Sequence, residues 1–217
     1  MEPMVRASSR LLTKNLKPVL RRGMRVGLLG GSFNPAHDGH LFISHLAIRR
    51  LKLDEVWWLV SPQNPLKPST DMAPYEKRIK YAHNIVSHPK IKISDAEFQM
   101  GTRYTAHTIR LLRLKNPHKQ FVWLIGADLL PEMSLWKDWE SIFALAPVAI
   151  FDRWPYARQL LTSKAAIRYL RARHPDRFAG SLANIKPPAW IYLYGPLNAT
   201  SATEIRKSAQ TTRSINN

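Results

Sequence analysis

The chain has 217 residues, 45% of them hydrophobic, which is enough to bury one substantial core, so we expect one domain. It contains no cysteine, which excludes disulfides and thiolate metal sites, and it has no run near the roughly 20 apolar residues that a membrane-spanning helix needs. A formal net charge of +18 leaves open one rival class, a basic module that binds nucleic acid.

Residues 1–24 are predicted to be a basic, disordered N-terminal extension, and residues 25–217 to be the single domain. Residues 1–25 hold seven Lys or Arg against one Glu, about a third of the net charge. Their acid-poor composition also resembles a mitochondrial transit peptide, and a misassigned translation start would explain it too. A basic tail on a cytoplasmic protein is the interpretation that we favour.

Apolar strands and amphipathic helices alternate through the rest of the chain. Strands are predicted at 25–29, 55–60, 91–94, 120–125, 147–151 and 190–194, and helices at 38–51, 74–87, 105–114, 135–144, 156–173 and 201–209. Such alternation predicts a parallel sheet covered on both faces, a doubly wound α/β fold. In this fold ligands bind beyond the carboxyl ends of the strands, where the strand order reverses.

The turn after the first strand carries the strongest functional signal, the run from Gly30 to His40. Gly30 and Gly31 lack a Cβ, which lets the backbone approach a ligand. The N–H groups at the start of the next helix favour an anion. His37 and His40 are three residues apart, so both imidazoles can face one phosphate. The whole run therefore predicts a triphosphate site.

Two motifs at opposite ends of the chain resemble those of the nucleotidylyltransferases. His37-Asp38-Gly39-His40 fits their His-x-Gly-His pattern, and Ser201 to Arg206 is similar to their Ser-x-Thr-x-x-Arg motif. Three segments between them resemble the nicotinate-nucleotide adenylyltransferases: Pro65-Leu66-Lys67, Tyr104 to Thr108, and Gly126-Ala127-Asp128 followed by Trp136. Leu66 stands where this family often has His, and His107 where it often has Asp. The resemblance implies a Rossmann-like nucleotidylyltransferase fold.

The resemblance also implies the roles of the site residues. Contacts to ATP are expected from Gly30, Gly31, Ser32, Phe33, Asn34, Ser201 and Thr203. His37, His40, Lys67 and Arg206 are the predicted catalytic residues, with His40 on the α-phosphate, Lys67 over the pyrophosphate and Arg206 on the β- and γ-phosphates. In the second subsite, Trp136 would stack on the pyridine, Thr105 and the backbone N–H of Lys137 would bind its carboxylate, and Asp128 would bind ribose hydroxyls.

The implied reaction is adenylyl transfer from ATP to nicotinate mononucleotide, giving deamido-NAD and pyrophosphate in NAD biosynthesis. Mg²⁺ is expected to arrive with ATP, and no protein metal ligand is predicted. ATP and nicotinate mononucleotide are the expected partners, with no nucleic acid and no membrane, and the oligomeric state is open. The alternatives are another acceptor, such as nicotinamide mononucleotide or phosphopantetheine, and the basic nucleic-acid-binding module, which steep salt dependence would reveal.

Overall fold

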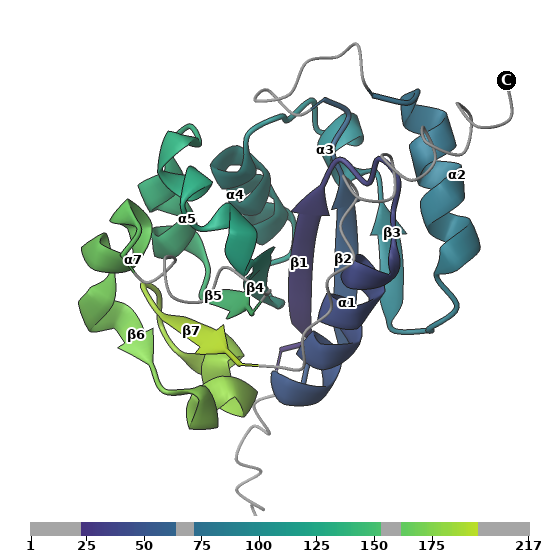
Figure 1. Ribbon diagram of the computed structural model, residues 1–217. Helices are drawn as coiled ribbons and strands as arrows, with labels where there is room; N and C mark the ends of the chain where they lie inside the picture. The colour runs from purple at the N-terminus through teal and green to yellow at the C-terminus, as the bar shows by residue number, and fades with distance from the viewer. Residues whose placement is uncertain (1–22, 64–71, 153–161, 195–217) are drawn as a thin grey trace, which may run out of the picture.

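Seven parallel strands form one sheet at the centre of the computed structural model, which describes residues 23–63, 72–152 and 162–194. The strand order is β3-β2-β1-β4-β5-β7-β6, and each neighbouring pair is parallel. Figure 1 shows α1 in front of the sheet, with α4 and α5 to its left. The predicted doubly wound α/β class is confirmed.

Strands and helices alternate along the described parts of the chain. The strands are β1 (Arg25–Gly31), β2 (Glu55–Val60), β3 (Ile91–Ser94), β4 (Gln120–Gly126), β5 (Val148–Phe151), β6 (Arg173–His174) and β7 (Trp190–Leu193). The α-helices are α1 (Asp38–Arg50), α2 (Tyr75–Ile85), α3 (Ala96–Gln99), α4 (Thr105–Lys115), α5 (Trp139–Leu145) and α7 (Lys164–Arg168). The 3₁₀ segments are η2 (Ala127–Leu129), η3 (Glu132–Leu135), η4 (Leu170–Ala172) and η5 (Asp176–Asn184).

Two hydrophobic layers cover the two faces of the sheet. On one face, side chains of α1, α2 and η5 pack on alternate strand residues such as Trp58 and Leu124. On the other face, α4, α5 and α7 pack on the intervening residues, such as Leu59 and Trp123. Successive side chains of a strand point to opposite faces, so a sheet covered on both sides needs continuous apolar strands. The hydrophobic effect of these two layers is the main force that holds the site in place.

The six predicted strands are all present, but one predicted helix is interrupted in its described part and another begins later than expected. The helix expected at 156–173 is interrupted in the described part from residue 162 on, because the chain passes from α7 through η4 into β6, which pairs with β7. The Trp190 indole N–H donates to the Tyr169 carbonyl at 2.7 Å, and this bond stabilises the non-helical course of the chain. The helix expected at 135–144 begins only at Trp139, because Asp138 has the left-handed φ of 53°.

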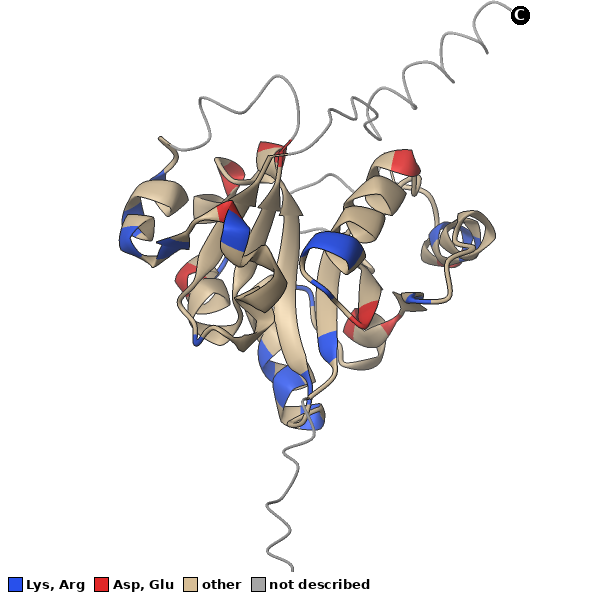
Figure 2. Ribbon diagram, turned by 90° about the horizontal axis from the view of Figure 1, so that it is seen from below, with Lys and Arg blue, Asp and Glu red and all other residues tan. Residues whose placement is uncertain are grey.

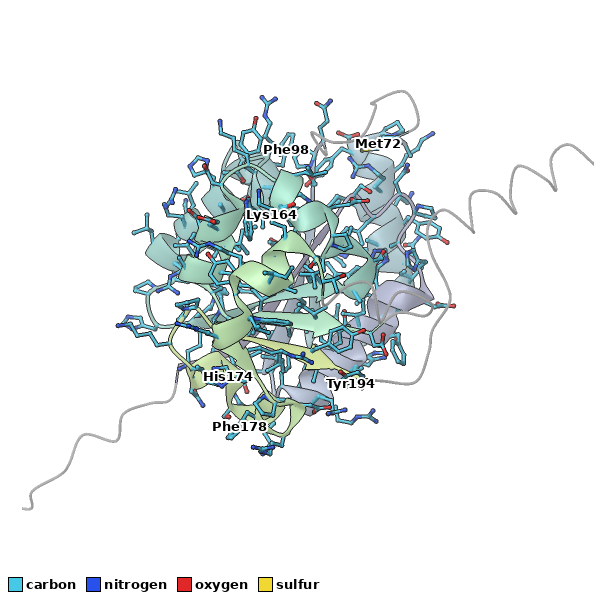
Figure 3. All side chains as sticks on the ribbon, turned by 60° about the vertical axis from the view of Figure 1, so that its left-hand side comes forward. Met72, Phe98, Lys164, His174, Phe178 and Tyr194 are labelled. Carbon is cyan, nitrogen blue, oxygen red and sulfur yellow. The ribbon has the colours of Figure 1, made fainter. Side chains whose placement is uncertain are left out.

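The surface shows where charge and exposed apolar groups lie. Lys and Arg lie on elements all around the sheet (Figure 2). Among the exposed large apolar side chains, Phe98 lies at the opposite end of the molecule from Phe178 and Tyr194 (Figure 3). None of the helices within the described ranges is both long and apolar enough to cross a lipid bilayer.

Strands β1 and β4 are neighbours at the centre of the sheet, and the chain leaves them toward opposite faces. The connection after β1 leads to α1 in one layer, and the one after β4 leads to η2 and α5 in the other. This is the switch point at which doubly wound sheets bind their ligands, beyond the carboxyl ends of the strands.

Candidate active site

Gly30 and Gly31 are the last two residues of β1, so the strand runs two residues further than predicted. They pair with Leu59 and Val60 of β2. A Cβ at Gly30 would lie 2.5 Å from the Trp123 ring, whereas one at Gly31 would lie 3.5 Å from Phe33, an ordinary contact. Packing against Trp123 is therefore a reason for glycine at position 30, and packing gives no such reason at position 31.

The turn after β1 is built around the buried side chain of Phe33. Its φ is +46°, and its ring, 1% exposed, stacks on Trp58 with the centroids 4.9 Å apart. The ring of Phe33 is therefore part of the core, and its predicted contact with ATP stays a prediction. Asn34 accepts the backbone N–H of Ala73 through Oδ1 at 3.1 Å, so this part of the turn is tied to the segment before α2.

His37 and His40 lie side by side, as their spacing predicts, with ring centroids 3.9 Å apart. His37 is the N-cap of α1, and its Nδ1 accepts the backbone N–H of Gly39 at 3.1 Å. His40 returns the arrangement, because its Nδ1 accepts the backbone N–H of His37 at 3.2 Å. The pair thus forms a capping box in which imidazoles take the place of the usual hydroxyl and carboxylate.

This cap decides which ring nitrogen carries hydrogen. A nitrogen that accepts a hydrogen bond has no hydrogen of its own, so in each neutral ring the hydrogen is on Nε2. The imidazoles also occupy two backbone N–H groups at the helix start, those of His37 and Gly39, whereas the sequence predicts that such groups bind the anion directly. The first turn of α1 thus fixes both the orientation and the tautomer of the two imidazoles.

A series of buried contacts with the core holds His40 in place. Its ring lies 4.5 Å from Phe33 and 5.7 Å from Trp58, measured between centroids. The hydroxyl of Ser44 donates to the His40 carbonyl at 2.8 Å and accepts the Trp58 indole N–H at 2.7 Å. Ser44 and Trp58 are fully buried, so the start of α1 is anchored in the core.

The second half of the site follows β4. A Cβ at Gly126 would lie 2.4 Å from Oδ1 of Asp128, so the absence of a side chain at Gly126 leaves room for this carboxylate beside the strand end. Trp136 follows η3 and is partly buried against the second hydrophobic layer. Lys137 places its Nζ 5.1 Å from the ring centroid of Tyr104, the residue before Thr105 at the start of α4. The structure thus brings the expected acceptor residues of α4 close to the segment after η3.

A buried polar cluster behind α4 was not predicted from the sequence. Glu97 accepts the hydroxyl of Thr108 at 3.1 Å, and the hydroxyls of Thr108 and Thr102 are 2.9 Å apart. Burial raises the pKa of Glu97 to about 7, and hydrogen bonds from Thr108 and Ser61 partly oppose this shift. The surrounding sequence carries no periodic signal for it, since α3 has only four residues.

Arg78 is a second residue that the sequence analysis missed. It lies on α2 with its side chain buried, and its guanidinium reaches backbone carbonyls in the segments that follow β1 and β2. A single arginine between two lysines of the same helix gives no sequence signal of burial. The exposed residues around it, Glu76, Lys77 and Lys80, have the composition of a solvated helix face.

Four predicted site residues lie outside the described residues: Lys67, Ser201, Thr203 and Arg206. Within the ranges that the structure describes, no cluster of three or more His, Asp or Glu residues could hold a metal ion. The site described so far therefore comprises the His37 and His40 turn and the residues after β4.

Comparison with known proteins gives a family and several relatives. Residues 28–208 match the cytidylyltransferase-like family model. A protein of Brucella abortus (strain 2308), described as a probable nicotinate-nucleotide adenylyltransferase, is 43% identical over 184 residues, which cover 85% of this chain and 95% of that protein. A relative with the same description from Gluconobacter oxydans (strain 621H) is 46% identical over 187 residues, covering 86% of this chain and 96% of its own.

Solved structures share the fold at low sequence identity. The nicotinic acid mononucleotide adenylyltransferase of Plasmodium falciparum, complexed with NaAD, has a TM-score of 0.63 at 18% identity and covers 84% of this chain and 82% of its own. The same enzyme complexed with APC has a TM-score of 0.62 at 18% identity, with 85% and 83% covered. These likenesses support the doubly wound nucleotidyltransferase architecture.

Proposed function

The chain belongs to the cytidylyltransferase-like family, within it to the nicotinate-nucleotide adenylyltransferases, and we propose that it transfers the adenylyl group of ATP to nicotinate mononucleotide. The products are deamido-NAD and pyrophosphate, in NAD biosynthesis. The observation that carries this proposal is the reciprocal cap of His37 and His40 at the end of β1, in a chain that matches 95% of the length of its Brucella relative.

The chemistry needs positioning and charge stabilisation more than a base. A phosphate oxygen of nicotinate mononucleotide attacks the α-phosphorus of ATP, and the bond from that phosphorus to the β-phosphate oxygen breaks. A phosphomonoester has a second pKa of about 6, so the attacking group is already an anion at neutral pH. The enzyme has to align two anions and stabilise the charge on the α-phosphate and on the leaving pyrophosphate.

The His37 and His40 rings are suited to this task. Both present Nε2–H as the hydrogen-bearing nitrogen, and both are held by the first turn of α1. Donors fixed before the reaction stabilise developing charge without a cost of reorganisation. His40, one turn into the helix and backed by Phe33, is assigned to the α-phosphate. The backbone of Gly31 to Asn34 would line the same phosphates.

The distal phosphates are assigned to residues outside the described ranges. Lys67 would neutralise the pyrophosphate, and Arg206 would bind the β- and γ-phosphates through its planar fork, with Ser201 and Thr203 as further donors. Mg²⁺ is proposed to enter with ATP, held by phosphate oxygens and water, and its charge would weaken the repulsion between the two substrates. Asp128 lies after β4, and its proposed role is to bind ribose hydroxyls.

The acceptor subsite is proposed around the start of α4. Thr105 and the backbone N–H of Lys137 would bind the nicotinate carboxylate, and Trp136 would stack on the pyridine ring. The nearness of Lys137 to Tyr104 supports this grouping, since it joins the two chain segments. A cytoplasmic location, a single domain over residues 25–217 and small-molecule partners alone all stay predictions.

A pyrophosphate-release assay tests the proposal. The full chain with ATP and Mg²⁺ is offered nicotinate mononucleotide, nicotinamide mononucleotide, phosphopantetheine or no acceptor. Release is expected to be fastest with the first and to leave deamido-NAD as the coupled product. Release that depends on phosphopantetheine alone, or no release with any acceptor, would overturn the assignment.

A further inference from the structure

The buried guanidinium of Arg78 joins three chain segments around the candidate active site. It is 3% exposed. Its Nε donates to the Ala73 carbonyl at 2.9 Å, and its Nη2 donates to the Pro62 carbonyl at 2.8 Å. Its Nη1 donates to the Ser32 carbonyl at 2.5 Å and to the Ser61 carbonyl at 2.8 Å. These partners belong to the turn after β1, the segment after β2 and the start of α2.

Burying a charged side chain is costly, so packing alone does not explain Arg78. A cation removed from water loses several kcal/mol unless hydrogen bonds compensate, and an apolar residue of similar size would fill the space without this cost. Burial accordingly lowers the pKa of Arg78. The compensation comes from four backbone carbonyls, three of which directly follow the ends of β1 and β2.

The segment from Ala73 to Arg78 holds the phosphate-binding turn at two points. Arg78 takes the carbonyl of Ser32, and the backbone N–H of Ala73 donates to the side chain of Asn34 at 3.1 Å. The turn lies between Gly31 and the His37 cap, so its position sets where α1 begins. A further bond from the Ser61 N–H to the Gly31 carbonyl, 2.9 Å long, joins the same two strand ends.

We propose that Arg78 is a positioning residue for adenylyl transfer, which fixes the Ser32 to Asn34 turn against the end of β2 so that the backbone and the His37 and His40 rings meet the phosphates of ATP. The inference rests on the proposed function. Arginine is needed because its fork carries five donors in a fixed plane, whereas lysine offers three donors from one atom and cannot reach all these carbonyls. Tyr75 covers the guanidinium, with its ring centroid 5.4 Å from Cζ.

The test compares Arg78→Lys and Arg78→Ala with a matched control at the other end of β1. Arg25 pairs with Asp54 there and has 14% of its side chain exposed, so Arg25→Ala also removes a largely buried, hydrogen-bonded guanidinium. A displacement of about 1 Å in a reacting group costs on the order of 100-fold in rate. We expect kcat/KM for ATP to fall by about this factor in both Arg78 variants, with KM for nicotinate mononucleotide changed by less than about threefold.

Arg25→Ala is expected to lower the thermal midpoint while leaving both KM values unchanged. Added guanidinium at millimolar concentration is expected to restore part of the ATP affinity of Arg78→Ala, a gain that a general loss of stability does not give. If Arg78→Ala does not fold, the kinetics of Arg78→Lys still test the positioning role.

The inference is overturned if Arg78→Lys has a lower thermal midpoint but the kcat/KM for ATP of the wild type. It is also overturned if kcat/KM falls equally for ATP and for nicotinate mononucleotide. ATP binding by calorimetry separates this failure from failure of the proposed function. If the wild-type chain does not use nicotinate mononucleotide, the function is wrong. Equal ATP affinity of wild type and Arg78→Lys then also refutes the positioning role, whereas weaker binding by the variant supports it.

Discussion

The Nδ1 of His40 accepts the backbone N–H of His37 at 3.2 Å, while the Nδ1 of His37 accepts the backbone N–H of Gly39 in the first turn of α1. Each imidazole is thus oriented by the backbone that carries the other. Metal-binding and catalytic histidines are commonly oriented by a hydrogen bond on the second ring nitrogen, because that bond fixes the tautomer. Here the first turn of α1 performs this task.

Replacing His40 with alanine is expected to lower kcat by about 100- to 1,000-fold, because it removes the donor that we propose for the α-phosphate. The lost cap is expected to cost about 1 kcal/mol of unfolding free energy. Steady-state pyrophosphate release and urea unfolding measure the two effects. His45→Ala, which removes an exposed imidazole from the same helix, is the control and is expected to keep wild-type turnover. Near wild-type kcat in His40→Ala would refute the assignment.

Alanine at Gly30 and at Gly31 should have different effects. Gly30→Ala places a Cβ 2.5 Å from the Trp123 ring and is expected to destabilise the fold by about 1–3 kcal/mol. Gly31→Ala meets Phe33 at an ordinary 3.5 Å and is expected to unfold like the wild type. A rise in KM for ATP in the stable Gly31 variant would show that the ligand needs this space. Unchanged kinetics there would remove Gly31 from the ATP site.

Glu97 is expected to make the wild-type protein lose stability as the pH rises. Its pKa is raised from 4.5 to about 7 in the folded state, so between these values the unfolded chain ionises while the folded one stays protonated. The loss is complete above about pH 7 and amounts to roughly 3 kcal/mol. Glu97→Gln mimics the protonated form, so we expect it to unfold like the wild type at pH 4 and to be more stable at pH 8.

Urea unfolding at several pH values checks this expectation. Glu76→Gln removes an exposed carboxylate from α2 and controls for the loss of charge itself. A difference between Glu97→Gln and wild type that does not change from pH 4 to pH 8 would contradict the predicted titration.

The acid nucleotide is expected to be the better acceptor by at least about tenfold, because the amide lacks the charge-assisted hydrogen bond to the donors of the subsite. Thr105→Val removes one donor and should reduce this preference, while Thr105→Ser should preserve it. The ratio of kcat/KM for nicotinate and nicotinamide mononucleotides is the measurement. Equal values for the two acceptors in the wild type would refute the subsite and leave the reaction class intact.

The sheet was predictable from the sequence because its strands are apolar on both faces and lie at regular intervals. The His37 and His40 pair was predictable because helical spacing places residues three apart on one face. The break at Asp138 was not, since a left-handed residue leaves no mark on the apolar pattern. Tertiary contacts also change the secondary structure of the described part of the 156–173 segment, because pairing of β6 with β7 overrides the helical pattern there.

The polar interior of the site was the least predictable part. The cap formed by the imidazoles depends on ring orientation, and Arg78 depends on four carbonyls from segments up to 46 residues away in the chain. The contacts of Arg78 arise only when the ends of β1 and β2 are placed next to one another, so residue spacing does not predict them. The imidazole cap is local, but spacing does not say which ring nitrogen faces the backbone. Phe33, which is predicted to contact ATP, packs its ring in the core against Trp58 of β2, and this contact is also tertiary.

Under the proposed roles of His37 and His40, α1 cannot fray at its start without disturbing the phosphate site. Opening the first turn of α1 would free the Gly39 amide and, in the same event, release both rings from their orientation. Hydrogen exchange at that amide would therefore follow the fraction of molecules competent for turnover. Denaturant concentrations or temperatures that open this one turn should abolish turnover well before the seven-stranded sheet unfolds.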